Sequence, residues 1–324
     1  MRKRILLVII LVVLFTIYGS RHEITYWKNT INSYYKDQCS EIKYKSDSIN
    51  IKILDYSDLP YVNKQKSISY NEIYDFDSVP LFCLNEKLIY HPVYLAQYSF
   101  RLLDVYNTTK DSSKLVRGEI IANKLLGISI YANSSIYFPY NVDYKNHNDK
   151  FQKLYAPWYS GMAQGQILSL FVRLYEITKK EKYLNACDKI FNSFTKLKGD
   201  NYNPWTVCVD KENYFWIEEY PSERPCFTIN GMIFGIYGVY DYYRITKCSI
   251  AKRILMASLT TVKKNIYKYR NKNDISYYCQ EENLKLIDYH TIVTEQFLQL
   301  FKITGDKFFL NVAIQLKSDT KNCK

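Results

Sequence analysis

Hydrophobic residues recur at helical spacing along most of the chain, in amphipathic runs that each end at a threonine followed by lysine or glycine. A second amphipathic run starts directly after each of these endings. The intervals between the endings leave room for two helices and one long loop each time. The pattern therefore predicts a mainly α fold, an (α/α) toroid-like array of about four helical hairpins. The predicted turns lie at Thr109, Thr178, Thr246 and Thr304.

Residues 22–80 differ from this pattern and are predicted to form a short β-rich or irregular lead-in. They contain a brief alternation of apolar and polar residues at Ile49–Leu54 and a turn signal at Asp58–Pro60. Residues 81–324 are predicted to form the helical domain. Its long loops are expected near residues 132–157, 197–225 and 268–290.

The amino terminus has the layout of a signal sequence. Residues 1–21 begin with Arg2, Lys3 and Arg4 and continue with an apolar run over Ile5–Tyr18. A basic start before a short apolar run is typical of a signal peptide or an uncleaved signal anchor, and the weak cleavage signal favours a single membrane anchor. Because basic flanks stay in the cytoplasm, the rest of the chain is expected outside it, in a Golgi lumen or a bacterial periplasm or exterior, and secreted if the anchor is cleaved.

The charge of the chain indicates the kind of partner. Lys and Arg number 44 and Asp and Glu 32, which gives a net charge of +12. Outside the cytoplasm this excess favours an acidic polysaccharide or an anionic membrane surface over nucleic acid. The eight cysteines have no CxxC spacing that would indicate their pairing. The four histidines are scattered, so no metal site is expected.

Two carboxylates and a phenol stand together at Glu218, Glu219 and Tyr220, directly before Pro221. The proline ring disfavours the helical conformation at the preceding residue, so the polar trio is expected in a loop. The apolar run over Phe227–Tyr243 is expected to be a buried helix. Catalytic groups lie preferentially on loops held by a rigid scaffold. The trio is therefore a candidate acid/base cluster, with an ordinary acidic surface loop as the alternative.

Four loop-to-helix junctions carry a tyrosine beside a hydrogen-bonding partner. Because each long loop connects one hairpin to the next, the junctions are expected to face one cleft along one rim of the array. A single tyrosine of this kind is most often a core residue with its hydroxyl in solvent, whereas four at corresponding positions indicate a shared functional cleft. The junctions are Tyr90-His-Pro-Val-Tyr-Leu-Ala-Gln97, Trp158-Tyr-Ser-Gly-Met-Ala-Gln-Gly-Gln166, Glu218-Glu-Tyr220 with Asn230-Gly231, and Asp288-Tyr-His-Thr291.

Four stretches at these junctions, in this order, resemble the helical carboxy-terminal domain of the glucuronyl C5-epimerases of heparan sulfate and heparosan modification. They are His91-Pro-Val-Tyr-Leu-Ala-Gln-Tyr98, Pro157-Trp-Tyr-Ser-Gly-Met-Ala-Gln-Gly-Gln166, Trp216-Ile-Glu-Glu-Tyr-Pro221 with Asn230-Gly231, and Asp288-Tyr-His-Thr291. The resemblance covers roughly Val79–Leu316. It implies epimerisation of glucuronic acid residues within a polysaccharide, in which the C5 proton is removed and a proton is returned to the opposite face. The reaction needs no cofactor.

The resemblance also implies a catalytic set. It consists of Glu219 and Tyr220, of Tyr289, and of a loop tyrosine for which Tyr278 is the nearest match and Tyr277 the alternative. The chemistry requires proton carriers on both faces of the sugar and neutralisation of the substrate carboxylate. A phenol is a poor base unless nearby cations lower its pKa, which the basic chain favours. We expect Glu219 and either Tyr289 or Tyr278 to be the opposed carriers, with Tyr220 supporting one of them.

Substrate-binding candidates come from the same junctions. Arginines and a histidine near them could hold the uronate carboxylate, and amide and aromatic side chains could contact the sugar. The carboxylate candidates are Arg101, Arg173, Arg224 and His290. The substrate-binding set is His91, Gln97, Trp158, Tyr159, Gln164, Asn230, His290 and Arg224.

The chain departs from the family pattern near its last loop. The family sequence Tyr-Asp-Leu-Arg-His is Tyr278-Cys-Gln-Glu-Glu282 here, which removes an arginine, and the second histidine of Tyr-His-Thr-x-His is Val293. Two other functions therefore stay open. A uronan polysaccharide lyase shares proton abstraction at C5 and then expels the 4-O substituent, and a non-catalytic relative would only bind the glycan.

Overall fold

The computed structural model describes residues 44–62, 73–145, 153–199, 202–280 and 284–320. Apart from residues 248–250, these residues belong to one compact unit. The predicted anchor over residues 1–21 lies outside the described ranges and stays a prediction. Among the described helices, none combines the length and the apolar character needed to span a membrane.

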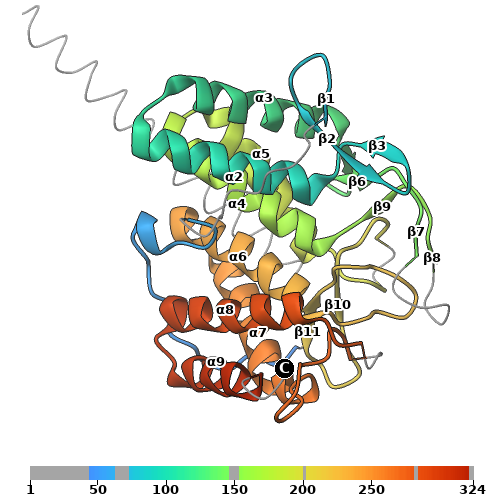
Figure 1. Cartoon of the computed structure of the whole chain (residues 1–324), viewed down its shortest axis with the longest axis vertical. Helices are drawn as coiled ribbons and strands as arrows, with labels where there is room; N and C mark the ends of the chain where they lie inside the picture. Colours follow the sequence, from blue (N-terminus) through green and yellow to red (C-terminus); the bar gives the residue numbers. More distant parts are fainter. Residues whose placement is uncertain (1–43, 63–72, 146–152, 200–201, 281–283, 321–324) are drawn as a thin grey trace, which may run out of the picture. The chain divides into compact units, whose positions relative to one another are not determined.

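Four pairs of helices follow one another along the described chain (Figure 1). The first helix of every pair is 18 residues long and starts after a long loop. The pairs are α2 (Pro92–Thr109) with α3 (Ser112–Ile128), α4 (Gly161–Thr178) with α5 (Glu181–Asn192), α6 (Ile229–Thr246) with α7 (Ser249–Asn265), and α8 (Ile287–Thr304) with α9 (Lys307–Asp319). The prediction of four helical hairpins is confirmed, and so are the positions of their turns.

The four long helices end in the same way. Each terminal threonine donates its hydroxyl to the carbonyl oxygen four residues earlier, at 2.7–2.8 Å. The next residue adopts the left-handed conformation that commonly ends a helix, with φ between 56° and 71° at Lys110, Lys179, Lys247 and Gly305. The repeated threonine therefore marks a repeated helix cap.

The long helices pack in one row, in which α4 contacts both α2 and α6, and α6 contacts α8 (Figure 1). The crossing of α4 and α6 is the tightest point. A Cβ atom on Gly165 would lie 2.4 Å from the Gly235 Cα atom, and one on Gly238 would lie 2.2 Å from the Gly165 carbonyl oxygen. Only glycine permits this approach of the two backbones.

Short strands occupy the lead-in and the long loops. A small antiparallel sheet precedes α2, and every paired strand in the loops is also antiparallel. The sequence pattern did not predict the loop strands. The strands are β1 (Ile73–Tyr74), β2 (Pro80–Leu84) and β3 (Lys87–Ile89) before α2, β4 (Ile130–Ala132) with β5 (Ser135–Tyr137), β6 (Pro139–Tyr140) with β9 (Trp158–Tyr159), β7 (Tyr144–Lys145) with β8 (Lys153–Leu154), and β10 (Val207–Val209) with β11 (Phe215–Ile217).

The described part of the lead-in before the sheet is irregular. The alternation at Ile49–Leu54 forms no strand, and over residues 44–62 the regular structure is one 3-10 turn, η1 (Tyr56–Asp58). Two further 3-10 turns, η2 (Ser193–Thr195) and η3 (Ile266–Lys268), extend α5 and α7. Over residues 44–62 the lead-in therefore follows the irregular alternative.

Residues 52–62, here called the strap, lie against the long helices. The Tyr61 ring stacks on Phe100 of α2 at 4.3 Å between centroids. The Tyr56 hydroxyl donates to Asp104 of α2 at 3.2 Å. Buried aromatic contacts of this kind hold an irregular segment that is not part of a helix or a sheet.

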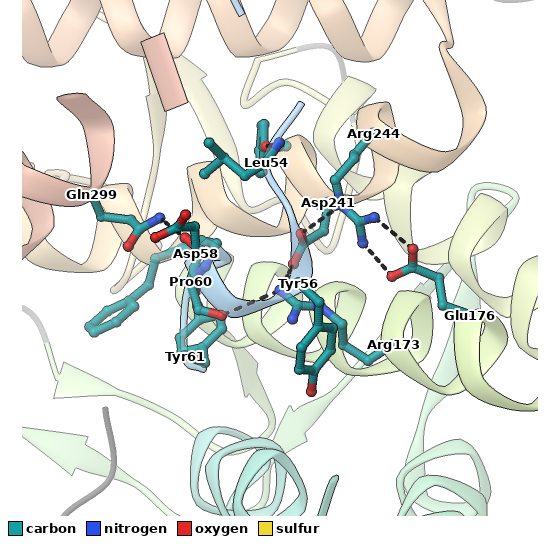
Figure 2. Close-up of polar contacts among 12 residues, drawn as sticks. Leu54, Tyr56, Asp58, Pro60, Tyr61, Arg173, Glu176, Asp241, Arg244 and Gln299 are labelled. Carbon is teal, nitrogen blue, oxygen red and sulfur yellow. Dashed lines mark hydrogen bonds and ion pairs between the residues drawn. The ribbon is translucent and has the colours of Figure 1, made fainter. Parts of the chain in front are cut away.

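Side chains at the same position of α4 and α8 bind the strap (Figure 2). Arg173 of α4 donates to the Pro60 carbonyl oxygen at 3.3 Å, and Gln299 of α8 donates to the Asp58 carbonyl oxygen at 2.7 Å. Arg173 also pairs with the buried Asp241 of α6 at 2.9 Å. The four residues at this position are Asp104, Arg173, Asp241 and Gln299. Three of them therefore contact the strap directly, and Asp241 holds Arg173 in place.

Candidate active site

The backbone before Glu219 is held on both sides. Directly after β11, the Glu218 N–H donates to the Thr206 carbonyl oxygen at 2.9 Å. The Glu218 carbonyl oxygen accepts from the N–H of Gly161, the first residue of α4, at 2.7 Å. A Cβ atom on Gly161 would lie 2.7 Å from that oxygen, so the close approach of α4 requires glycine.

Glu219 lies against the first turn of α6. Its Oε2 atom accepts a hydrogen bond from the Thr228 hydroxyl at 2.9 Å. Thr228 is the N-cap residue of α6, yet its hydroxyl makes no capping bond to the helix backbone. Burial raises the pKa of Glu219, and hydrogen bonds from Thr228, Tyr220 and Tyr278 lower it in part. The positive end of the helix also favours the ionised carboxylate.

Three tyrosines surround this carboxyl group. The Tyr278 hydroxyl donates to Glu219 Oε2 at 3.3 Å, and the Tyr220 and Tyr278 hydroxyl oxygens are 3.2 Å apart. The Tyr289 ring meets the Tyr278 ring edge-on, with centroids 4.5 Å apart. Tyr289 is half-buried, whereas the other three side chains are buried. The structure thus brings all four predicted catalytic residues together. They are called the acid–phenol cluster.

The last long loop distinguishes Tyr278 from its neighbour. The Tyr278 N–H donates to the Leu284 carbonyl oxygen at 2.9 Å, and its side chain enters the buried cluster. Tyr277 is half-buried and has the Lys285 ammonium 5.7 Å from its ring centroid. Tyr278, not Tyr277, is therefore the tyrosine that reaches Glu219.

Aromatic rings from the first long loop line the acid–phenol cluster. Trp158 stacks on Tyr140 with centroids 4.0 Å apart and donates its indole N–H to the Val142 carbonyl oxygen at 3.0 Å. Tyr144 stacks on Tyr220 at 5.4 Å. Trp158 was a predicted contact, but the sequence reasoning missed Tyr140 and Tyr144. The antiparallel pairs β6–β9 and β7–β8 bring these two rings back to the site, and two-residue strands leave no periodic signal.

Burial decides the ionisation of the phenols. It raises the pKa of Tyr220 and Tyr278 well above the usual value, and it also raises the pKa of Tyr289. The negative charge of Glu219 acts in the same direction, and within the described residues no cation offsets these effects. The expectation that nearby cations lower these values is therefore wrong for the described part of the chain, because the basic side chains lie elsewhere.

Two more substrate-binding candidates lie at the edge of this region. His91 is the N-cap of α2 and accepts from the Tyr94 N–H at 3.2 Å, and its ring meets Tyr140 edge-on at 4.9 Å. Burial lowers its pKa to about 4, so it is neutral. Asn230 is buried in the first turn of α6, and its main-chain carbonyl oxygen accepts a hydrogen bond from the Gln296 side chain at 2.9 Å.

Gln164 and His290 were predicted to bind the substrate, but the polar atoms of both side chains have structural partners instead. The Gln164 side chain accepts from the Phe138 N–H at 3.2 Å and donates to the Ile136 carbonyl oxygen at 2.8 Å. The two ring nitrogens of His290 bond the Ser276 N–H at 2.9 Å and the Leu316 carbonyl oxygen at 3.0 Å. Each side chain uses its polar atoms on the backbone, so neither is placed to bind a sugar.

The remaining candidates lie outside the acid–phenol cluster. Arg173 was a candidate for binding the uronate carboxylate, but it is buried between the strap and Asp241. Tyr159 packs edge-on against Tyr137 at 5.7 Å, on the opposite side of β9 from Trp158. The others belong to neighbouring surfaces, namely Gln97 on α2, Arg101 over the Tyr98 ring, and the exposed Arg224 on the loop before α6.

Comparison with known proteins identifies the family. Residues 132–318 match the family described as the D-glucuronyl C5-epimerase C-terminus. This region is more than half of the chain and includes the acid–phenol cluster. The chain belongs to this family. The resemblance that the sequence motifs indicated is thereby confirmed.

Two relatives give the extent of the similarity. An uncharacterized protein of Methanocaldococcus jannaschii is 27% identical over 176 residues, which cover 54% of this chain and 55% of that protein. The D-glucuronyl C5-epimerase of Caenorhabditis elegans is 33% identical over 92 residues, 28% of this chain and 14% of that enzyme. The family member described here thus matches about half of the archaeal relative and a small part of the animal enzyme.

Solved structures support the architecture. A sugar epimerase from a ruminal bacterium superimposes with a TM-score of 0.56 and 12% identity, over 78% of this chain and 66% of that one. Cellobiose 2-epimerase from Bacillus thermoamylovorans gives a TM-score of 0.54 and 11% identity, over 71% and 60% of the two chains. At these identities the likeness concerns the fold alone, and it confirms the predicted (α/α) toroid-like architecture for this family member.

The first turn of α6 provides a test of the Glu219 geometry. A Cβ atom on Gly231 would lie 2.2 Å from Glu219 Oε2, so Gly231→Ala should displace the carboxyl group. We expect about 100-fold lower catalytic activity, since small displacements of a reacting group cost about this much. Gly127→Ala, on α3 with no atom within 4 Å of the added carbon, is the control. Full activity in Gly231→Ala would show that this geometry is not needed.

Proposed function

We propose that this protein is a C5-epimerase of glucuronic acid residues in a polysaccharide. The main support is the hydrogen-bonded chain from Tyr220 through Tyr278 to Glu219. The half-buried Tyr289 packs against Tyr278, and the protein belongs to the D-glucuronyl C5-epimerase family. Groups that exchange protons are thereby lined up, and Tyr289 is the partly exposed one. The similarity to the Caenorhabditis elegans D-glucuronyl C5-epimerase supports the glucuronyl substrate.

Burial raises the pKa of Tyr220 and Tyr278, so these phenols are neutral before reaction. The proton acceptor is then the carboxylate of Glu219, whose ionised form is favoured, against the effect of burial, by hydrogen bonds from Thr228, Tyr220 and Tyr278. The C5 proton passes to the Tyr278 oxygen while the Tyr278 hydroxyl proton moves along its hydrogen bond to Glu219 Oε2. This step leaves a neutral Glu219, a neutral Tyr278 and an enolate of the substrate.

Tyr289 completes the reaction from the opposite face of the sugar. Its hydroxyl proton goes to C5, and Glu219 returns its proton through Tyr278 to the Tyr289 oxygen, so that every group regains its starting state. Hydrogen bonds from the phenols to the substrate carboxylate stabilise the enolate, because a preorganised donor acts strongly in a buried site. The rings of Tyr144 and Trp158 supply the apolar wall against which a sugar packs.

The partner and compartment follow from the composition of the chain. The net charge of +12 supports an acidic polysaccharide such as a heparosan-like glucuronan as the substrate. The basic start and apolar run over residues 1–18 support a single amino-terminal anchor with the helical domain outside the cytoplasm. Both parts of this proposal are independent of the acid–phenol cluster.

Isotope exchange tests the proposed reaction. Incubation of the protein with heparosan in heavy water should place deuterium at C5 of the uronic acid residues and convert part of them to the C5 epimer. The length of the polymer should not change, because no glycosidic bond breaks. Nuclear magnetic resonance of the product and size-exclusion chromatography measure the two quantities.

The same assay distinguishes the two alternative functions. A lyase would shorten the polymer and leave unsaturated uronic acid at the new ends, which absorb ultraviolet light. A glycan-binding protein without catalysis would retain the polymer on an affinity support and incorporate no deuterium. Either result would overturn the epimerase proposal.

A further inference from the structure

Glu218 is the buried carboxyl group that the proposed reaction does not use. It precedes Glu219 in the chain, but its side chain points to a different set of neighbours. Its Oε1 atom accepts a hydrogen bond from the Phe227 N–H at 3.2 Å, and its Oε2 atom has no hydrogen-bond partner among the described residues. The residue is completely buried. Removing a carboxyl group from water is costly, so the interactions of this buried acid must offset that cost.

The group that Glu218 holds is a strained turn before α6. Phe227 has φ of 53°, a left-handed conformation that is uncommon for a residue other than glycine. Glu218 holds its N–H, and the Tyr269 hydroxyl donates to its carbonyl oxygen. Both ends of this residue are therefore fixed by side chains from other parts of the fold, as strained positions at functional sites require.

The turn leads directly to Glu219. The residue after Phe227 is Thr228, whose hydroxyl donates to Glu219 Oε2 instead of capping α6. A movement at Phe227 would carry the Thr228 hydroxyl with it, because the two residues share a peptide group. The contacts form a continuous path from Glu218 through the turn to the proposed proton acceptor.

We infer that Glu218 is a positioning residue for Glu219: its carboxyl group holds the turn that brings the Thr228 hydroxyl to Glu219, and it does so without carrying a charge. A neutral carboxyl group still offers a carbonyl oxygen to the Phe227 N–H. An ionised one would place a second negative charge beside Glu219 and oppose the formation of an enolate. The kinetic part of this inference rests on the proposed function.

The surroundings of Glu218 support the neutral state. Burial raises its pKa to about 8, and the hydrogen bond from Phe227 and the charge of Glu219 are smaller influences of opposite sign. The other titratable groups that face it are Cys208, Cys279 and Tyr269. Burial raises the pKa of Cys208 and Tyr269 well above their usual values. Between Glu218, Cys208 and Tyr269, Glu218 is therefore the group expected to ionise near pH 8.

Glu218→Gln is the decisive variant, because glutamine has the shape of the neutral acid and keeps an oxygen for the Phe227 N–H. Thermal unfolding provides the first readout and needs no activity. A raised carboxyl pKa stabilises the native state below the unfolded-state value and this stabilisation is lost as pH rises through about 8. The Tm of the wild type should therefore fall by several degrees more than that of Glu218→Gln between pH 6 and pH 9. The exposed Glu223→Gln on the same loop is the control and should follow the wild type.

Deuterium exchange at C5 provides the second readout. The rate of the wild type should fall above about pH 8, and Glu218→Gln should move this alkaline limit upward by about one pH unit or more. Glu218→Ala removes the acceptor for Phe227 and should lower kcat by about 10-fold with a smaller effect on KM, because it disturbs alignment and not the sugar contacts. Activity in Glu218→Gln shows that the proposed function and the neutral role both hold.

Other outcomes overturn the inference while leaving the epimerase proposal intact. A Glu218→Gln protein with a lower Tm at neutral pH would show that the native group is ionised. An unchanged alkaline limit in an active Glu218→Gln protein would show that Glu218 has no effect on the proton transfer. Absence of exchange in the wild type would instead contradict the proposed function, and the Tm comparison would still decide the protonation of Glu218.

Discussion

Glu219→Gln, Tyr278→Phe and Tyr289→Phe should each lower deuterium exchange at C5 by about 100-fold or more, since each removes a proton carrier of the proposed reaction. Glutamine cannot accept the proton, and phenylalanine lacks the hydroxyl group that passes it on, as Tyr278 does to Glu219 across 3.3 Å. The effects should not add in double variants, because the three groups act as one unit.

The exposed Tyr155→Phe, in the same long loop as Trp158, is the matched control and should retain full exchange. Circular dichroism and Tm separate a catalytic loss from unfolding. Full activity in all three site variants would rule out the proposed site. Loss of the folded state in all three would mean that the buried hydroxyl and carboxyl groups are structural, since an unpaired buried partner is costly.

Arg173→Met should lower the free energy of unfolding by about 3–5 kcal/mol, because it leaves a buried carboxylate without its main partner. The guanidinium pairs with Asp241 at 2.9 Å, and both side chains are almost completely buried. The Pro60 carbonyl oxygen of the strap loses its donor as well. Urea unfolding monitored by fluorescence measures the change.

A second variant separates the cost of the unpaired charge from the loss of packing. Arg173→Met combined with Asp241→Leu should recover much of the stability, as replacement of a whole buried pair by apolar groups often does. Lys302→Met breaks the exposed ion pair with Asp58 on the same strap and should cost less than about 1 kcal/mol. A cost below about 1 kcal/mol for Arg173→Met would show that the pair is hydrated.

The fold could be predicted where a local rule repeats. The four helix ends were visible in the sequence because each uses a threonine hydroxyl and a left-handed residue, which are short-range requirements. The strap could not be predicted, because its irregular backbone is fixed by side chains from helices far along the chain. The loop strands were missed because strands of two or three residues are too short to show an alternation.

The acid–phenol cluster could be predicted from motifs, whereas the roles of several neighbours could not. Gln164 and His290 belong to the same motifs, but their polar atoms are used by nearby backbone groups. A sequence does not show which polar residue of a junction points outward. The charge argument failed at the phenols because net charge describes the whole chain, while the pKa of Tyr278 depends on its own burial.

The contacts of the strap limit the order in which parts of the molecule can fold. Asp58 accepts its hydrogen bond from Gln299, a residue 241 positions later in the chain. Ribosomal synthesis delivers the strap long before α8, so this contact forms only after the intervening helices have been made. Such distant pairings slow folding, because a long loop must close before they stabilise the native state. A nascent chain that stops before α8 therefore leaves the aromatic and polar side chains of the strap without their α8 contacts.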